Sequence, residues 1–240
     1  MKSIKIILTL VAVTMLSSCN LDMHLGHEHG NGNVVTEERT VTENFNKVKG
    51  SNGLDIFLTQ GSENKIVVEA DENLLDIIET NISNGKLTIR ADKNIGRSKS
   101  KKVYVTYKKL ISVEATSGAD VIANSILKSE SLTLKSSSGA DLEVEVLSRE
   151  LFVETSSGAD IELSGKASSL NARASSGSDL NARRLTVKNC NARASSGADI
   201  TITVKEKLDA KASSGGDINY YGDPEAVTKK NSSSGSVRKM

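Results

Sequence analysis

Aspartate residues recur at one position of a pentapeptide, Ser-Ser-Gly-Ala-Asp, that the chain repeats. The pentapeptide is complete at 137–141, 156–160 and 195–199, with near copies at 116–120, 175–179, 213–217 and 233–237 and a distant copy at 51–55. Carboxylates held in a row can share Ca²⁺, which takes several oxygen ligands. The candidate residues for a weak cation site are Asp120, Asp141, Asp160, Asp179, Asp199 and Asp217.

The same pentapeptide can also have a purely structural role. Aspartate can hydrogen-bond its own bend, glycine can supply a positive φ, and serine hydroxyls can form ladders between successive repeats. Calcium-binding β-rolls carry several glycines and a denser acidic motif in each repeat, whereas this repeat has one aspartate. The structural role is therefore favoured, and the cation site stays open as the alternative.

Catalytic constellations are not evident in the sequence. All three histidines lie before residue 30, so a Ser/His nucleophile pair is excluded from the repeat region. Glycoside hydrolysis needs two carboxyl groups in different environments, and the many Asp and Glu residues here show no such contrast. We predict no catalytic residues and no enzymatic activity.

The three histidines, His24, His27 and His29, lie in a segment rich in Gly and Asn that lacks hydrophobic periodicity. Imidazoles this close on a flexible chain can share a metal ion. No second cluster of acid or thiol ligands is evident to complete the site, which favours a polar linker. We therefore predict a flexible tether over residues 19–35.

Residues 1–18 have the features of a signal peptide. Lys2 and Lys5 precede an apolar run of eleven residues, which is too short for a permanent membrane helix, and small residues then lead to Cys19. This end looks like a bacterial lipobox, which predicts lipidation of Cys19; the alternative is an ordinary secretory signal. A lipid anchor places the protein on a membrane of the cell envelope, which we expect to be the outer membrane, on either its periplasmic or its exterior face.

The repeat predicts the fold. Its glycines, from Gly118 to Gly235, are 18 to 21 residues apart, and apolar residues stand at odd distances from them while charged and polar residues stand at even distances. Because side chains alternate between the two faces of a strand, each unit reads as two strands joined by a bend. We predict an all-β, right-handed parallel β-helix with coils of about 20 residues. A propeller needs about forty residues per blade, and a sandwich needs closer turn signals.

The boundaries follow from this pattern. We predict one β-helix domain over residues 36–240, with N-terminal coils and a strand/helix cap over 36–110 and the repeats over 111–240. The cap contains a predicted helix at 71–80, with Asp71 as N-cap, and a hairpin at Asn84-Gly85. Cys190 replaces a leucine of the repeat and is predicted to be a buried filler, and the charged C-terminal residues favour a monomer or small oligomer.

Charge narrows the choice of partner. The chain has 31 basic and 30 acidic residues, for a net charge of +1, which gives no reason to expect nucleic acid. Acidic residues dominate the outer positions of the earlier repeats, and basic residues dominate the later ones, including Arg173, Arg193 and Lys211. The basic strip could bind anionic glycans or protect sheet edges.

Several segments resemble the head GIN domain family, which is named for autotransporter adhesins. They are GLDIFLTQG (53–61), VVEADENLLDIIET (67–80), NGKLTIRA (84–91) and the repeated pentapeptides. The resemblance implies a right-handed β-helix of the kind found in lipoproteins of Bacteroidetes-type bacteria, and it supplies no catalytic residues. We expect a non-catalytic module for adhesion, binding or scaffolding with an envelope glycan or protein as ligand; a carbohydrate-active β-helix enzyme is the alternative.

Overall fold

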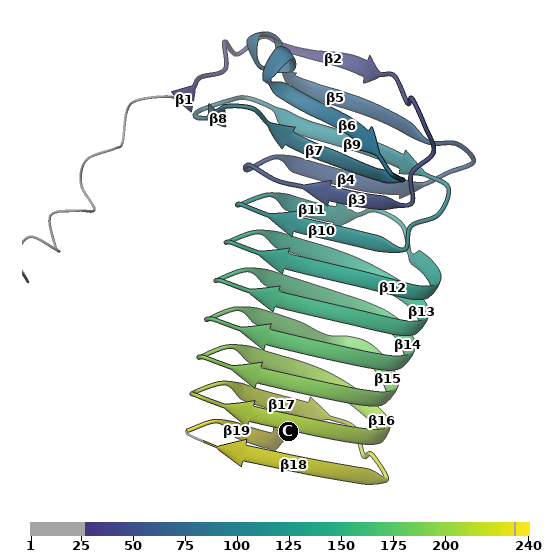
Figure 1. The fold of residues 1–240 in the computed structure, drawn as a ribbon, viewed down its shortest axis with the longest axis vertical. Helices are drawn as coiled ribbons and strands as arrows, with labels where there is room; N and C mark the ends of the chain where they lie inside the picture. The colour runs from purple at the N-terminus through teal and green to yellow at the C-terminus, as the bar shows by residue number, and fades with distance from the viewer. Residues whose placement is uncertain (1–26, 233) are drawn as a thin grey trace, which may run out of the picture.

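The computed structural model describes residues 27–232 and 234–240. It is a β-solenoid of about 7 turns with about 19 residues per turn, so the predicted all-β fold and its coil length are confirmed. The chain winds as a right-handed coil from the cap to the last coil (Figure 1). Within the described residues, no helix is both long enough and apolar enough to cross a membrane.

The described residues form one 3₁₀ helix, η2 (Glu72–Ile77), and the strands that follow in chain order. They are β1 (His27–Glu28), β2 (Val34–Arg39), β3 (Lys47–Gly50), β4 (Asp55–Gln60), β5 (Lys65–Asp71), β6 (Ile78–Ser83), β7 (Lys86–Ala91), β8 (Asn94–Ile95), β9 (Lys101–Tyr107), β10 (Ser112–Thr116), β11 (Asp120–Ala123), β12 (Leu127–Ser137), β13 (Asp141–Ser156), β14 (Asp160–Ser175), β15 (Asp179–Ser195), β16 (Asp199–Ser213), β17 (Asp217–Tyr221), β18 (Ala226–Ser232) and β19 (Ser236–Lys239).

Two flat sheets form the solenoid (Figure 1). What we call the front sheet stacks β6, β7, β3, β10, β12, the second halves of β13 to β16, and β18. The back sheet stacks β2, β5, β9, β4, β11, the first halves of β13 to β16, β17 and β19. Pairing is parallel from β7 and β9 onward, and antiparallel where β2, β5 and β6 cover the first coil.

The core lies between the sheets and has the alternation that the sequence predicts. One inward column of the front sheet consists of Leu132, Leu151, Leu170, Cys190 and Leu208, each at most 4% exposed. Beside it, Ala172, Ala192 and Ala210 are fully buried, and these small side chains let the two sheets approach closely. Cys190 is a free, buried thiol, and burial raises its pKa well above the usual range, so its role as an apolar filler is confirmed.

The repeated pentapeptides form the corners at which the front sheet passes to the back sheet. At the Ser-Gly corners from Ser117-Gly118 to Ser214-Gly215 the serine before the glycine and the glycine itself both have positive φ, for example 57° at Ser157 and 67° at Gly158. Such a pair of left-handed residues is typical of a type I′ turn. The sequence predicted positive φ for glycine alone, so the left-handed serine is an addition.

Backbone hydrogen bonds join each Ser-Gly corner to the next coil. From Gly118 to Gly197 the glycine N–H donates to the carbonyl of the left-handed serine one coil further along, as from Gly139 to Ser157 (3.1 Å) and from Gly158 to Ser176 (3.1 Å). The predicted ladder of serine hydroxyls is therefore largely replaced by a ladder of main-chain bonds. The only hydroxyl pair of this kind in the described corners is Thr116 with Ser137, at 3.0 Å.

The cap differs from the prediction in its helix. Residues 71–80 do not form an α-helix: η2 is a single 3₁₀ segment, and Ile78–Ser83 is the strand β6. The reason is the hairpin, because Asn84 and Gly85 adopt positive φ (53° and 70°) and pair β6 with β7 in antiparallel register. The predicted hairpin at Asn84-Gly85 is thus confirmed. Its first strand, β6, includes residues 78–80, which the predicted helix would have contained.

Asp71 also has a different role from the predicted N-cap, since its side chain makes no cap hydrogen bond. Its fully buried carboxylate accepts the backbone N–H groups of Gly32 (2.9 Å), Lys99 (3.1 Å) and Ser100 (3.0 Å). Burial alone would raise the pKa of Asp71, but these N–H donors and the charge of Lys99 outweigh burial and lower it.

The predicted tether is shorter than expected. Asp71 ties Gly32 to the cap, β1 pairs with β8, and β2 pairs with β5 from Val34 onward. Residues 27–35 are therefore part of the folded cap, and the predicted boundary at residue 36 is corrected to include them. The signal peptide, Cys19 and His24 lie outside the described residues.

Candidate functional site

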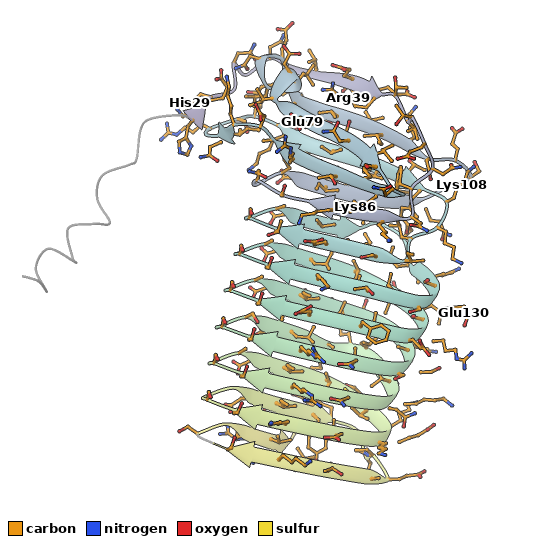
Figure 2. The ribbon with its side chains drawn as sticks, viewed as in Figure 1. His29, Arg39, Glu79, Lys86, Lys108 and Glu130 are labelled. Atoms are coloured by element: carbon orange, nitrogen blue, oxygen red, sulfur yellow. The ribbon has the colours of Figure 1, made fainter. Side chains whose placement is uncertain are left out.

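The aspartates of the repeat lie in one column on the back sheet, next to the Ser-Gly corners. Parallel pairing aligns them residue by residue, so neighbouring Cα atoms are about 4.8 Å apart. The column, called here the aspartate column, is Asp55, Asp120, Asp141, Asp160, Asp179, Asp199 and Asp217. Figure 2 shows oxygen-bearing side chains repeated at these corners down the stack.

The two ends of the aspartate column have different neighbours. Asp55 is in register with Lys102 of β9. At the other end, the carboxylate of Asp217 accepts the backbone N–H (3.1 Å) and the hydroxyl (2.7 Å) of Ser236. Among the described residues, the carboxylates from Asp120 to Asp199 accept no hydrogen bond, so the predicted Asx-turn bonds do not form. The N–H of each of these residues instead donates to the preceding coil, as from Asp141 to Ala119.

Crowding of like charges affects these carboxyl groups. Partial burial, followed by the charges of Asp120 and Asp160, raises the pKa of Asp141. Burial and the charges of Asp160 and Asp199 likewise raise the pKa of Asp179. At Asp141 and Asp179 the folded state therefore disfavours ionisation, and a positive ion or a proton would relieve this cost.

A shallow groove of about 340 Å³ runs beside the upper part of the aspartate column, lined partly by Asp141, Glu143 and Glu162. Glu162 is already paired with Arg184 at 2.7 Å. Over residues 27–232 and 234–240, no three His, Cys, Asp or Glu side chains are grouped closely enough to hold a metal ion. Calcium binding along this column stays a prediction.

Two of the three histidines, His27 and His29, belong to the described cap. His29 lies on the outside of the cap beside β1 (Figure 2). Its Nδ1 accepts the backbone N–H of Arg97 at 3.1 Å, which gives this imidazole a structural hydrogen bond. The predicted metal set of His24, His27 and His29 stays untested, because His24 lies outside the described residues.

A second surface, on the front sheet, was not singled out from the sequence. Phe152 points outward there and is 44% exposed. Two hollows of about 360 Å³ and 300 Å³ share Phe152 and Asn171, and they extend to Arg173 on one side and to Asn191 on the other. An aromatic ring beside amide and charged groups offers both an apolar platform and hydrogen-bonding partners for a ligand. The signal that could have located it is a large aromatic at an outward position of the repeat.

The raised pKa values lead to a test of the aspartate column. Asp141→Asn removes a charge that its neighbours disfavour and sacrifices no hydrogen bond, so we expect a higher Tm at pH 7, by an amount equivalent to about 1 kcal/mol or less. Because the folded-state pKa is raised, the penalty is absent below the ordinary pKa of 3.8 and develops as the pH rises through the raised value. The gain in Tm should therefore shrink as the pH falls towards 3.8. Glu145→Gln, which removes a negative charge outside the column, is the control and should show no such trend.

The effect of Ca²⁺ on thermal stability distinguishes a structural role of the aspartate column from cation binding. With the structural role, thermal unfolding followed by circular dichroism gives the same Tm with and without millimolar Ca²⁺. A calcium-dependent rise in Tm that is lost in Asp141→Asn would contradict this expectation and support the cation site.

The sequence and the fold of this protein resemble those of known proteins. Residues 44–224 match the family described as "Putative auto-transporter adhesin, head GIN domain". No curated protein matches the sequence. The crystal structure of a "putative adhesin" from Bacteroides fragilis NCTC 9343 has a TM-score of 0.82 at 20% identity, and the alignment covers 89% of this chain and 100% of that one.

Two other crystal structures share the fold. A "putative adhesin" from Parabacteroides merdae ATCC 43184 has a TM-score of 0.72 at 24% identity, covering 90% of this chain and 99% of that one. A "putative lipid binding protein" from Parabacteroides distasonis ATCC 8503 has a TM-score of 0.72 at 20% identity, covering 89% and 99%. The family match spans more than half of the chain, and the protein therefore belongs to the head GIN domain family.

Proposed function

We propose that this protein is a non-catalytic adhesion-type module of the cell envelope that binds its ligand on the front sheet. The observation that carries the proposal is the exposed Phe152 at the junction of two hollows lined by amide and charged side chains. Membership in a family named for adhesins and the fold shared with crystal structures described as adhesins support it. A stiff solenoid held by continuous parallel pairing is suited to presenting such a surface.

The acids at this surface favour binding over catalysis. A glycosidase needs one carboxyl group with a raised pKa and a second one facing it across the sugar. Glu154, in the first hollow, is paired with Lys135 at 2.8 Å. Asp209, in the second hollow, lies three coils further along the stack, so the two acids do not face each other across one sugar. The carboxyl groups with raised pKa values, such as Asp141 and Asp179, belong to the back sheet beyond the Ser-Gly corner.

A glycan array combined with an activity screen on polysaccharides tests the proposal. We expect stable binding without turnover, and Phe152→Ala should weaken binding roughly tenfold because the ring contributes contact area at the centre of the surface. Leu147→Ala is the matched control, since Leu147 is another exposed apolar side chain (50%) that belongs to the corner opposite the Ser-Gly corner. Turnover without stable binding would contradict the proposal and favour the enzyme.

We also propose that Cys19 carries the lipid that anchors the protein to the outer membrane. The support is the position of Cys19 directly after the apolar run of the signal sequence. Only 7 residues separate Cys19 from His27, where the described cap begins, so the anchor would hold the capped end of the solenoid near the membrane.

Metabolic labelling with a fatty-acid analogue tests the anchor. We expect the wild type to be labelled and to partition with membranes, and Cys19→Ser to lose both properties. Cys190→Ala is the control, because Cys190 is buried in the solenoid and should be irrelevant to labelling. An unlabelled wild type that is released in soluble form would favour an ordinary secretory signal.

A further inference from the structure

One outward column of the front sheet changes its charge pattern halfway along the stack. Parallel pairing puts one residue of each coil into it, four positions before the corner glycine except in the last coil, where Lys230 lies five positions before Gly235. From the cap downward the column reads Lys49, Glu114, Lys135, Glu154, Arg173, Arg193, Lys211 and Lys230. Its first four members alternate in sign, and its last four are all cations.

The alternating half neutralises itself. Lys49 and Glu114 approach to 2.6 Å, and Lys135 and Glu154 approach to 2.8 Å. The four following residues, Arg173, Arg193, Lys211 and Lys230, are called here the cation column. Within the described part of the chain, none of them lies within ion-pair distance of an acid, and all four are exposed.

Four aligned cations at the strand spacing of about 4.8 Å repel one another, although water and salt moderate the cost. Edge protection does not account for them, because Arg173, Arg193 and Lys211 belong to strands that are paired on both sides. The upper half of the same column shows that the fold accommodates alternating charges there. The lower half is therefore suited to an anion from outside the chain.

The columns on either side of the cation column are polar. On one side stand Asn171 and Asn191, in register with each other, and on the other side stand the serines of the pentapeptides. Phe152 lies one coil above Asn171, in the same outward column. Two acids border the cations on this face: Glu154, which is in register with Arg173 and is paired with Lys135, and Asp209, which follows Asn191 in its column. Hydroxyl and amide groups beside a row of cations, with an aromatic ring at one end, match the chemistry of an acidic sugar chain.

We propose that the cation column binds a linear polysaccharide that carries one carboxylate per sugar. The inference rests on the proposed function and adds the ligand class. The extended polymer lies along the solenoid axis, with carboxylates on the cations, hydroxyls on the asparagines and serines, and one ring against Phe152. Each sugar advances such a polymer by about the length of one pyranose ring, which is close to the spacing of the strands, so the carboxylates that face the protein stay within reach of the long Arg and Lys side chains. Single-stranded nucleic acid fits less well, since it favours an aromatic platform for each of several bases.

Binding of oligogalacturonate, measured by calorimetry at low and physiological salt, tests this proposal. We expect the triple variant Arg173→Gln/Arg193→Gln/Lys211→Gln to bind roughly tenfold more weakly or worse and to lose most of the salt dependence. The matched control is Lys128→Gln/Arg149→Gln/Lys205→Gln, which removes the same charge at the opposite corner and should bind like the wild type. Methyl-esterified oligogalacturonate, which has the same rings without the charge, should bind neither the wild type nor the variants measurably.

Three outcomes would overturn the ligand class. One is equal loss of binding in both triple variants, which would indicate general attraction by net charge. Another is equal or tighter binding of a thymidine oligonucleotide or of phosphatidylglycerol vesicles that depends on the same three residues. The third is failure of oligogalacturonate to bind a wild-type protein whose thermal unfolding is normal. A neutral glycan that binds through Phe152 and is insensitive to the triple variant would overturn this inference and leave the proposed function standing.

Discussion

The main-chain hydrogen bonds at the Ser-Gly corners are the interaction on which the rest of the structure depends. A left-handed conformation costs an L-residue about 1–2 kcal/mol, and each of these corners places a serine in it beside the glycine. The serine carbonyl then points along the stack and accepts the glycine N–H of the preceding coil. The bonds recur from Gly53 to Gly197 and fix how each coil sits on the next, and the register of both sheets follows from that.

Fixed register turns single positions of the repeat into columns of side chains. The aspartate column on one side of the corners and the cation column on the other are products of the same stacking, separated only by the turn. Neither column has to be held by side-chain hydrogen bonds, because the backbone aligns its members. A surface built in this way can change its ligand by substitution at outward positions while the inward leucines, valines and alanines keep the core unchanged. This property suits an adhesion-type module, in which the scaffold is constant and the exposed face determines specificity.

The sequence predicted the solenoid because its signals are local and repeated: the spacing of the glycines, the parity of apolar residues and the hairpin dipeptide Asn84-Gly85. The prediction from sequence was wrong where the structure depends on pairing between segments that are distant in the chain. The helix predicted at 71–80 does not form, because strand pairing in the cap takes up its last residues. The hydrogen bonds of Asp71 with Gly32 and Ser100 join residues that are distant in the sequence and that no local pattern connects. The predicted tether was too long for the same reason, since β1 pairs with β8, a strand that is distant in the sequence. The surface around Phe152 depends on which outward residues become neighbours, and this requires the register across several coils.

Hydrogen exchange at the corner glycines, resolved by NMR, tests the central claim most directly. A turn amide facing water exchanges quickly, whereas one bonded in a continuous ladder is protected as strongly as its strands. We predict that the amides of Gly139, Gly158 and Gly177 exchange as slowly as those of the buried strand residues Leu151 and Leu170. Fast exchange at these glycines beside slow exchange in the strands would show that the corners follow the register instead of setting it, and would contradict the account.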